Sequence, residues 1–128
     1  MEREELSATA LLRKLNTKGG LIGYLGTDDG KEVSRRAQSG DERARLIFEG
    51  MAYQVAKEIG ACAAVLRGDV QAIILTGGFA RDKMFTGWIA ERTKFIAEIV
   101  VMPGEDEQQA LSISALRVLT RQEEALVY

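Results

Sequence analysis

Residues 72–80, with the sequence AIILTGGFA, constrain the fold of this chain more than any other stretch. The apolar run before the glycines is short and rich in isoleucine, which is typical of a strand buried on both faces. An amphipathic run containing Phe85 and Trp88 follows directly after Arg81. The stretch therefore predicts a buried strand, a turn and a helix, which places the chain in the α/β class.

Two interpretations of the turn at Gly77 and Gly78 stay open. Adjacent glycines remove both Cβ atoms where the chain leaves the sheet, so a flat ligand could approach the bare backbone. The helix that follows would direct its free N–H groups towards the same place, which suits a phosphate or an electron-rich ring edge. Alternatively, the glycines only supply the positive φ of a tight turn, and the turn binds nothing.

The composition excludes several classes of partner and of catalytic or metal site. The 128 residues suit one domain, with 46% hydrophobic and 28% charged residues and a net charge of −2. This balance predicts no nucleic-acid partner and no membrane span. The single cysteine excludes a disulfide framework and predicts a cytoplasmic protein. Because the chain has no histidine, a histidine base or ligand is excluded, and Mg²⁺ on carboxylates and phosphates is the expected metal.

Hydrophobic periodicity predicts the remaining elements. Asp29 with Glu32 and Ser39 with Glu42 have the spacing of capping boxes that begin helices. Residues 21–25 are either a strand or a loop under a helix. The expected helices are residues 2–15, 33–37, 39–66, 82–95 and 108–121, and a second strand spans residues 98–102. The alternation of helices and strands predicts two parallel strands with helices on both faces.

Two expectations concern the hydrophobic core. The long helix of residues 39–66 has a continuous apolar face that includes Cys62, which we interpret as a buried, unreactive core residue. In the last helix, Leu111, Val118 and Leu119 fall on one side. That side is expected to face the core.

With these elements in order, two stretches resemble motifs of the superfamily of acetate and sugar kinases, heat-shock chaperones and actin. Residues 73–80 (IILTGGFA) resemble its adenosine-binding motif, and residues 106–115 (DEQQALSISA) its second connecting motif. Within the superfamily the chain is most similar to butyrate kinases, over about residues 16–121. The stretches that carry this similarity are residues 18–29, 40–44, 51–61 and 103–107.

The resemblance implies a ribonuclease H-like (actin-like ATPase) C-terminal subdomain, with an incomplete sheet covered by helices. Residues 1–128 would form a single domain, the nucleotide-binding part of a two-domain kinase, with the helix of residues 1–15 outside the resemblance. Butyrate kinases make an acyl phosphate from a short-chain fatty acid and ATP, reversibly and with Mg²⁺. ATP or ADP and Mg²⁺ are therefore the implied cofactors.

The resemblance also implies site residues. Gly77, Gly78 and Ala80 would face the adenosine, and Arg81 would stack against the adenine. Asp29 and Lys31 stand where related acetate kinases contact the nucleotide, with lysine in place of their arginine.

Glu107 is the implied residue near the metal. An equally open alternative is that it is only a first-turn acid that complements the helix dipole.

The phosphate-binding motifs of the family have no counterpart in this chain, so no catalytic residue is assigned. Two functional hypotheses remain open. In the first, the chain is the adenosine-binding part of a carboxylate kinase and binds the fatty acid only together with the missing half. In the second, it is a non-catalytic nucleotide-binding or interaction module. Either one predicts a homo-oligomer or pairing with an N-terminal kinase half, because an incomplete sheet leaves an open edge.

Overall fold

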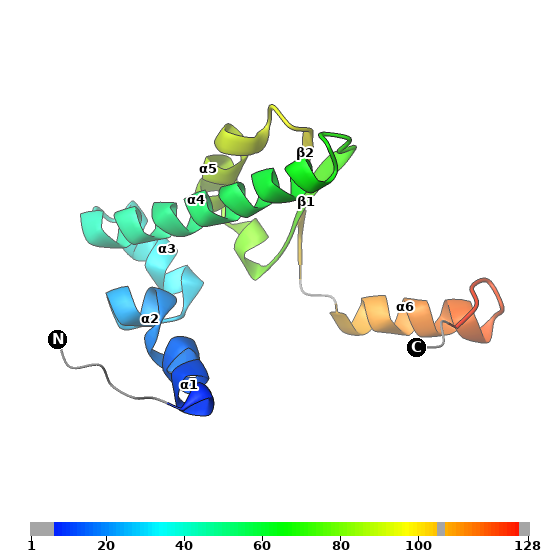
Figure 1. Cartoon of the computed structure of the whole chain (residues 1–128), viewed down its shortest axis with the longest axis horizontal. Helices are drawn as coiled ribbons and strands as arrows, with labels where there is room; N and C mark the ends of the chain where they lie inside the picture. The colour runs from blue at the N-terminus through cyan, green and yellow to red at the C-terminus, as the bar shows by residue number, and fades with distance from the viewer. Residues whose placement is uncertain (1–6, 105–106, 126–128) are drawn as a thin grey trace.

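Helix α4 is the longest element, and the rest of the main body is arranged around it (Figure 1). The computed structural model describes residues 7–104 and 107–125. Helices α3 and α5 pack against α4, whereas α6 stands apart from the main body. The elements in chain order are α1 (Ala8–Lys18), α2 (Gly20–Leu25), α3 (Gly30–Gln38), α4 (Glu42–Val65), β1 (Ala72–Gly77), the 3₁₀ helix η1 (Gly78–Arg81), α5 (Lys83–Thr93), β2 (Glu98–Pro103) and α6 (Glu107–Leu119).

The hydrophobic core lies where α3, α4 and α5 meet. Its buried residues are Val33, Phe48, Ala52, Phe85 and Ile89. They come from the apolar faces that helical spacing predicts, so each helix is held mainly by burying one stripe against the other two. Burial of a large side chain of this kind contributes about 1.5–3 kcal/mol.

An aromatic cluster extends this core to η1. Phe48 stacks on Phe85 with ring centroids 4.9 Å apart, and Phe79 of η1 lies 5.3 Å from Phe85. Trp88 meets Phe48 edge-on at 5.9 Å. Aromatic pairs at these separations add about 0.5–1.5 kcal/mol each beyond simple burial. The turn after β1 is therefore anchored to the core by an aromatic side chain.

Strands β1 and β2 pair in parallel, from Ala72 opposite Glu98 to Gly77 opposite Pro103, which confirms the predicted parallel order. The prediction that β1 is buried on both faces is wrong. Ile73 is 7% exposed, whereas its neighbour Ile74 is 60% exposed. Successive side chains of a strand point to opposite faces, so only the face that carries Ile73 is covered, and the expected layer of helices on the second face is not present among the described residues.

Three details of the helices differ from the sequence prediction. Residues 21–25 are neither strand nor loop, because they lie in the short helix α2. Asp41, not Ser39, caps α4 by accepting a hydrogen bond from the backbone N–H of Ala44. The cap of α3 by Asp29 is confirmed, with a bond from Lys31 N at 2.9 Å. Glu32 does not complete a capping box and instead accepts a bond from Thr27.

Two predictions about buried apolar residues are wrong for a common reason. Cys62 is exposed, and Leu111 and Leu119 of α6 are also exposed. Each has apolar neighbours along its own helix, but the described residues place no second layer over these faces. A cavity of about 540 Å³ along the C-terminal half of α4 is lined mainly by apolar residues, including Val55, Ile59 and Cys62.

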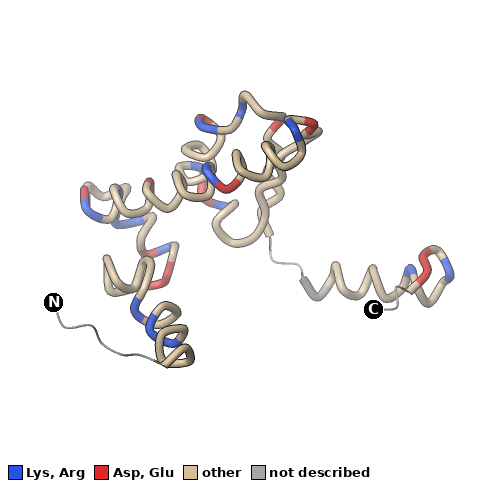
Figure 2. Tube along the Cα trace, in the orientation of Figure 1, with Lys and Arg blue, Asp and Glu red and all other residues tan. Residues whose placement is uncertain are grey.

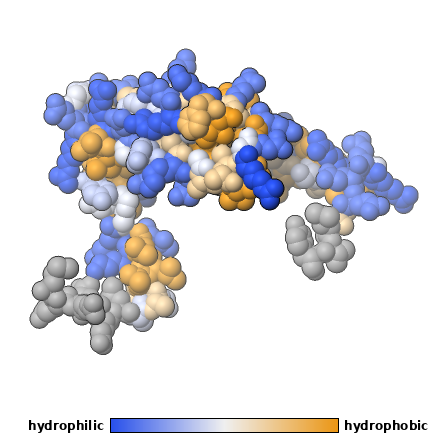
Figure 3. Space-filling view, turned by 45° about the horizontal axis from the view of Figure 1, so that its top comes forward, coloured by the Kyte–Doolittle hydropathy of each residue, from blue (hydrophilic) through white to orange (hydrophobic). Residues whose placement is uncertain are grey.

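Hydrophobic and hydrophilic side chains are also unevenly distributed over the surface. Figure 3 shows hydrophobic side chains gathered in the middle of the main body and on the lobe below it, between hydrophilic borders. Charges of both signs are otherwise spread along the trace (Figure 2). Within residues 7–104 and 107–125, no helix is long and apolar enough to cross a membrane.

Candidate functional site

A cavity of about 610 Å³ lies between one side of α3 and the η1 turn. One wall is formed by the loop before α3 and by one side of that helix, with Asp28, Asp29, Gly30, Lys31, Ser34, Arg35 and Gln38. The other wall is formed by η1 and the start of α5, with Gly78, Phe79, Arg81 and Asp82. This volume lies within the range of cavities that hold small molecules in proteins.

The η1 wall depends on the two glycines that follow β1. Gly77 has φ 81°, a left-handed conformation that strongly favours glycine. Gly78 begins η1 and is not among the residues with positive φ. The turn therefore needs glycine for its conformation at Gly77, while Gly78 lies on the cavity wall.

A close approach of α3 to η1 joins the two walls. A Cβ atom added at Gly30 would lie 2.3 Å from Cε1 of Phe79. No real Cβ contact is that short, so any residue with a Cβ atom at position 30 would force the Phe79 ring to shift. The first turn of α3 is thereby held against η1.

Asp82 fixes the end of η1. Its Oδ1 accepts hydrogen bonds from the backbone N–H groups of Met84 and Phe85, both at 2.9 Å, and so caps α5. Its Oδ2 accepts a short hydrogen bond from the hydroxyl of Ser34 on α3. The same carboxylate therefore begins one helix and ties it to the opposite wall of the cavity.

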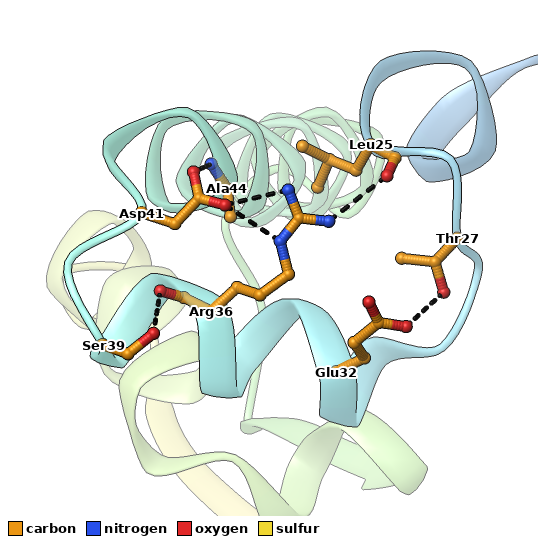
Figure 4. A network of polar contacts seen from close by, with 7 residues as sticks. All are labelled: Leu25, Thr27, Glu32, Arg36, Ser39, Asp41 and Ala44. Carbon is orange, nitrogen blue, oxygen red and sulfur yellow. Dashed lines mark hydrogen bonds and ion pairs between the residues drawn. The ribbon is translucent and has the colours of Figure 1, made fainter.

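Arg36 orients α3 from its far side (Figure 4). Its guanidinium bonds Asp41 through Nε at 2.9 Å and Nη2 at 2.8 Å, and it donates to the carbonyl oxygen of Leu25 at 3.2 Å. The hydrogen bond from Ala44 N and the one from Arg36 lower the pKa of Asp41. Arg36 thus links α2, α3 and α4 in one network.

Four of the residues that the sequence suggested for nucleotide binding come together in this cavity: Asp29, Lys31, Gly78 and Arg81. Gly77 lies one residue before the wall. Ala80 is 6% exposed and is not among the lining residues. The side chain of Glu107, the residue suggested for the metal, lies outside the described residues.

Five further residues of the cavity were not predicted from the sequence: Ser34, Arg35, Gln38, Phe79 and Asp82. A signal was present for α3, because Lys31, Ser34, Arg35 and Gln38 recur at helical spacing opposite the buried Val33 and Ala37. Sequence spacing marks these polar residues as one face of a helix. It does not show that η1 lies opposite that face.

Carboxylates are few at this site. Within the residues that the structure describes, no group of three acidic or cysteine side chains could hold a metal ion. Asp28 and Asp29 lie at one end of the cavity. Mg²⁺ is commonly held by one or two carboxylates together with phosphate oxygens. These two residues therefore fit a metal site that includes phosphate oxygens better than a site formed by the protein alone.

A sequence model of the acetokinase family matches residues 1–102. The chain belongs to the acetokinase family. This family fits an actin-like ATPase fold, which agrees with the mixed α/β arrangement and the open parallel sheet seen here. The matched range includes residues 1–15.

Curated relatives of this chain are named as butyrate kinases. It is 52% identical to a probable butyrate kinase 2 of Caldanaerobacter subterraneus over 91% of its own length and 33% of the relative. It is 51% identical to a probable butyrate kinase of Listeria innocua (87% of this chain, 31% of the relative). It is 49% identical to butyrate kinase 2 of Clostridium acetobutylicum (92% and 33%). The chain therefore spans about a third of the length of these relatives.

Proposed function

We propose that this chain is the C-terminal, adenosine-binding part of a butyrate kinase-like carboxylate kinase. The complete enzyme would convert ATP and a short-chain fatty acid to ADP and an acyl phosphate, in the cytoplasm. The observation that carries the proposal is the meeting of Asp29 and Lys31 with Gly78 and Arg81 around one cavity, although the two pairs are far apart in the sequence.

The lining residues fit a nucleoside. The backbone at Gly78 would let the nucleoside lie close to η1, while Arg81 and Arg35 offer guanidinium groups from opposite walls. A guanidinium over an aromatic ring contributes about 0.5–2 kcal/mol. Lys31 would add a positive charge for the phosphates. When the nucleotide brings Mg²⁺, the ion would neutralise phosphate charge, with Asp28, Asp29 or Glu107 as the available carboxylates.

The first test is nucleotide binding by the 128-residue chain. Gly78→Val should abolish or strongly weaken ADP binding in titration calorimetry with little loss of stability, because the added side chain would occupy the ligand's space. Gly87→Val on α5, where an added Cβ meets open space, is the matched control. If Gly78→Val bound ADP like the parent, or simply unfolded, the assignment of the adenosine site would be wrong.

We further propose that the chain does not catalyse phosphoryl transfer by itself. This reaction needs donors on the β- and γ-phosphates, a held metal ion and an oriented acceptor at the same time. Contacts to the adenosine bind substrate and transition state equally, so they add affinity without speeding the chemical step. A second part, from an N-terminal kinase half, would supply the phosphate-binding groups and the fatty-acid pocket.

A coupled assay of ADP release with butyrate, ATP and Mg²⁺ tests this division. The chain is assayed alone and mixed with a separately expressed N-terminal half of a butyrate kinase. Turnover only in the mixture is the expected result. Turnover by the chain alone would refute the proposal of an inactive part.

A second candidate function is a non-catalytic interaction module. The observation in its favour is the uncovered apolar surface, with Ile74 on the sheet and Val65 and Leu66 at the end of α4 all exposed. Surfaces of this kind mark contacts between proteins. If neither the chain alone nor the mixture released ADP, while the chain still bound nucleotide, this function would be favoured.

A further inference from the structure

A chain of side-chain hydrogen bonds joins the α3 wall of the cavity to the start of α5. The amide nitrogen of Gln38 donates to the hydroxyl oxygen of Ser34 at 3.0 Å. The hydroxyl of Ser34 in turn donates to Oδ2 of Asp82. Ser34 is buried, and all three residues line the cavity.

The direction of this chain is fixed by its last member. A carboxylate only accepts hydrogen bonds, so the single hydroxyl hydrogen of Ser34 must go to Asp82. Towards Gln38, the Ser34 oxygen can then only accept, and the NH₂ end of the amide has to face it. The carbonyl oxygen Oε1 is left as the free end of Gln38, and it has no partner among the described residues.

We propose that Gln38 selects the base of the bound nucleotide by presenting this oxygen. The inference rests on the proposed function, since it concerns the same cavity. The cavity is also lined by the cationic donors Lys31, Arg35 and Arg81. Oε1 is a neutral acceptor among them, so it accepts a hydrogen bond from the 6-amino group of adenine. A 6-oxo purine presents an acceptor at the same place, which leaves two oxygens facing each other.

The selectivity is set by Asp82, which acts as a positioning residue and does not need to touch the base. In Asp82→Asn the Oδ1 atom stays a carbonyl oxygen, so the cap on Met84 and Phe85 is kept. The amide NH₂ replaces Oδ2 and donates to Ser34. The Ser34 hydroxyl then donates to Oε1 of a flipped Gln38, whose NH₂ end becomes free. The variant should therefore favour a 6-oxo base.

Titration calorimetry of the 128-residue chain with ADP and with IDP tests the inference, because the two nucleotides differ only at position 6 and the neighbouring ring nitrogen. The parent should bind ADP about tenfold more tightly, which is the effect of one hydrogen bond made or lost. Asp82→Asn should remove or invert this ratio. Gln38→Met should bring the ratio close to one, whereas Gln54→Met, an exposed glutamine of α4 outside this cavity, should leave it unchanged.

The outcomes separate the two proposals. If the parent bound neither nucleotide, the proposed function and this inference would both be wrong. If ADP and IDP bound equally, and Gly78→Val weakened both, the adenosine site would stand and the role of Gln38 would be refuted. An unchanged ratio in a folded Asp82→Asn variant would also overturn it. Should that variant fail to melt cooperatively by circular dichroism, an unchanged ratio in Gln38→Met decides against the inference in the same way.

Discussion

The two halves of α4 have similar apolar patterns in sequence but lie in different surroundings. In the N-terminal half, Ala44, Phe48 and Ala52 are fully buried against α3 and α5. In the C-terminal half, Ala56 and Ala63 are buried, whereas Cys62 and the capping residue Leu66 are exposed and Val65 is 82% exposed. Both halves carry apolar residues at helical spacing. An apolar stripe therefore shows which face a helix can bury, whereas the elements around the helix decide how much of that face is buried.

The largest expected effect comes from truncating one apolar side chain in each half of α4 and comparing the losses of stability. Phe48→Ala should lower the free energy of unfolding by about 3–5 kcal/mol, since it removes the centre of the aromatic cluster. Val65→Ala should change it by less than about 0.5 kcal/mol. Urea denaturation followed by circular dichroism measures both. Similar losses for the two variants would mean that the C-terminal half is packed as well.

A pair of glycine substitutions sharpens the contrast at the edge of the packed half. Gly30→Ala should destabilise the protein by about 1–3 kcal/mol, because its new methyl group meets the Phe79 ring. Gly50→Ala, in the middle of α4 with open space around it, should stabilise by about 0.5–1 kcal/mol. Thermal melts report both signs. A neutral Gly30→Ala would show that the ring moves aside without cost.

The apolar surface left open at the C-terminal half of α4 and on β1 should cause the chain to associate. The open face of β1 and the end of α4 present apolar surface, and β1 and β2 are the two strands of the described sheet. Sedimentation velocity at tens of micromolar should therefore show dimers or larger species. Ile74→Lys should weaken this association about tenfold or more, which is about 1.4 kcal/mol.

Leu46→Lys is the matched control for that experiment. Leu46 is exposed on the N-terminal half of α4, apart from the open face, and its replacement should leave the association unchanged. A compact monomer that binds no dye for apolar surfaces would contradict the prediction.

The smallest expected effect concerns acid stability. The pKa of Asp41 is lowered by its bonds from Ala44 N and Arg36. A carboxylate with a lowered pKa stabilises the folded state above its unfolded pKa, and the stabilisation is lost as the pH falls through the folded value. Asp41→Asn should therefore melt at a lower temperature than the parent at neutral pH, and the difference should shrink below about pH 4. A difference that stayed constant from pH 7 to pH 3 would contradict this assignment.

Local chemistry accounts for what the sequence predicted correctly. The order of helices and strands, the parallel pairing of β1 and β2 and the cap at Asp29 all follow from residues that are close in the sequence. The exposure of Ile74, Cys62 and Leu111 could not be predicted in this way, because it depends on whether another element covers each face. The same distinction holds for the cavity. Its glycine turn was visible in the sequence, whereas Ser34, Gln38 and Asp82 form one network only once α3 faces η1.

The contact between Gly30 and Phe79 has a consequence for how such chains can evolve. A larger residue at position 30 would displace the ring at 79, so it should be accepted more readily after the residue at 79 has become smaller. The order of substitutions then matters, and the two positions are expected to vary together among homologues. In an alignment of homologues, glycine at position 30 should accompany a bulky aromatic residue at 79, and alanine should accompany a smaller aliphatic one.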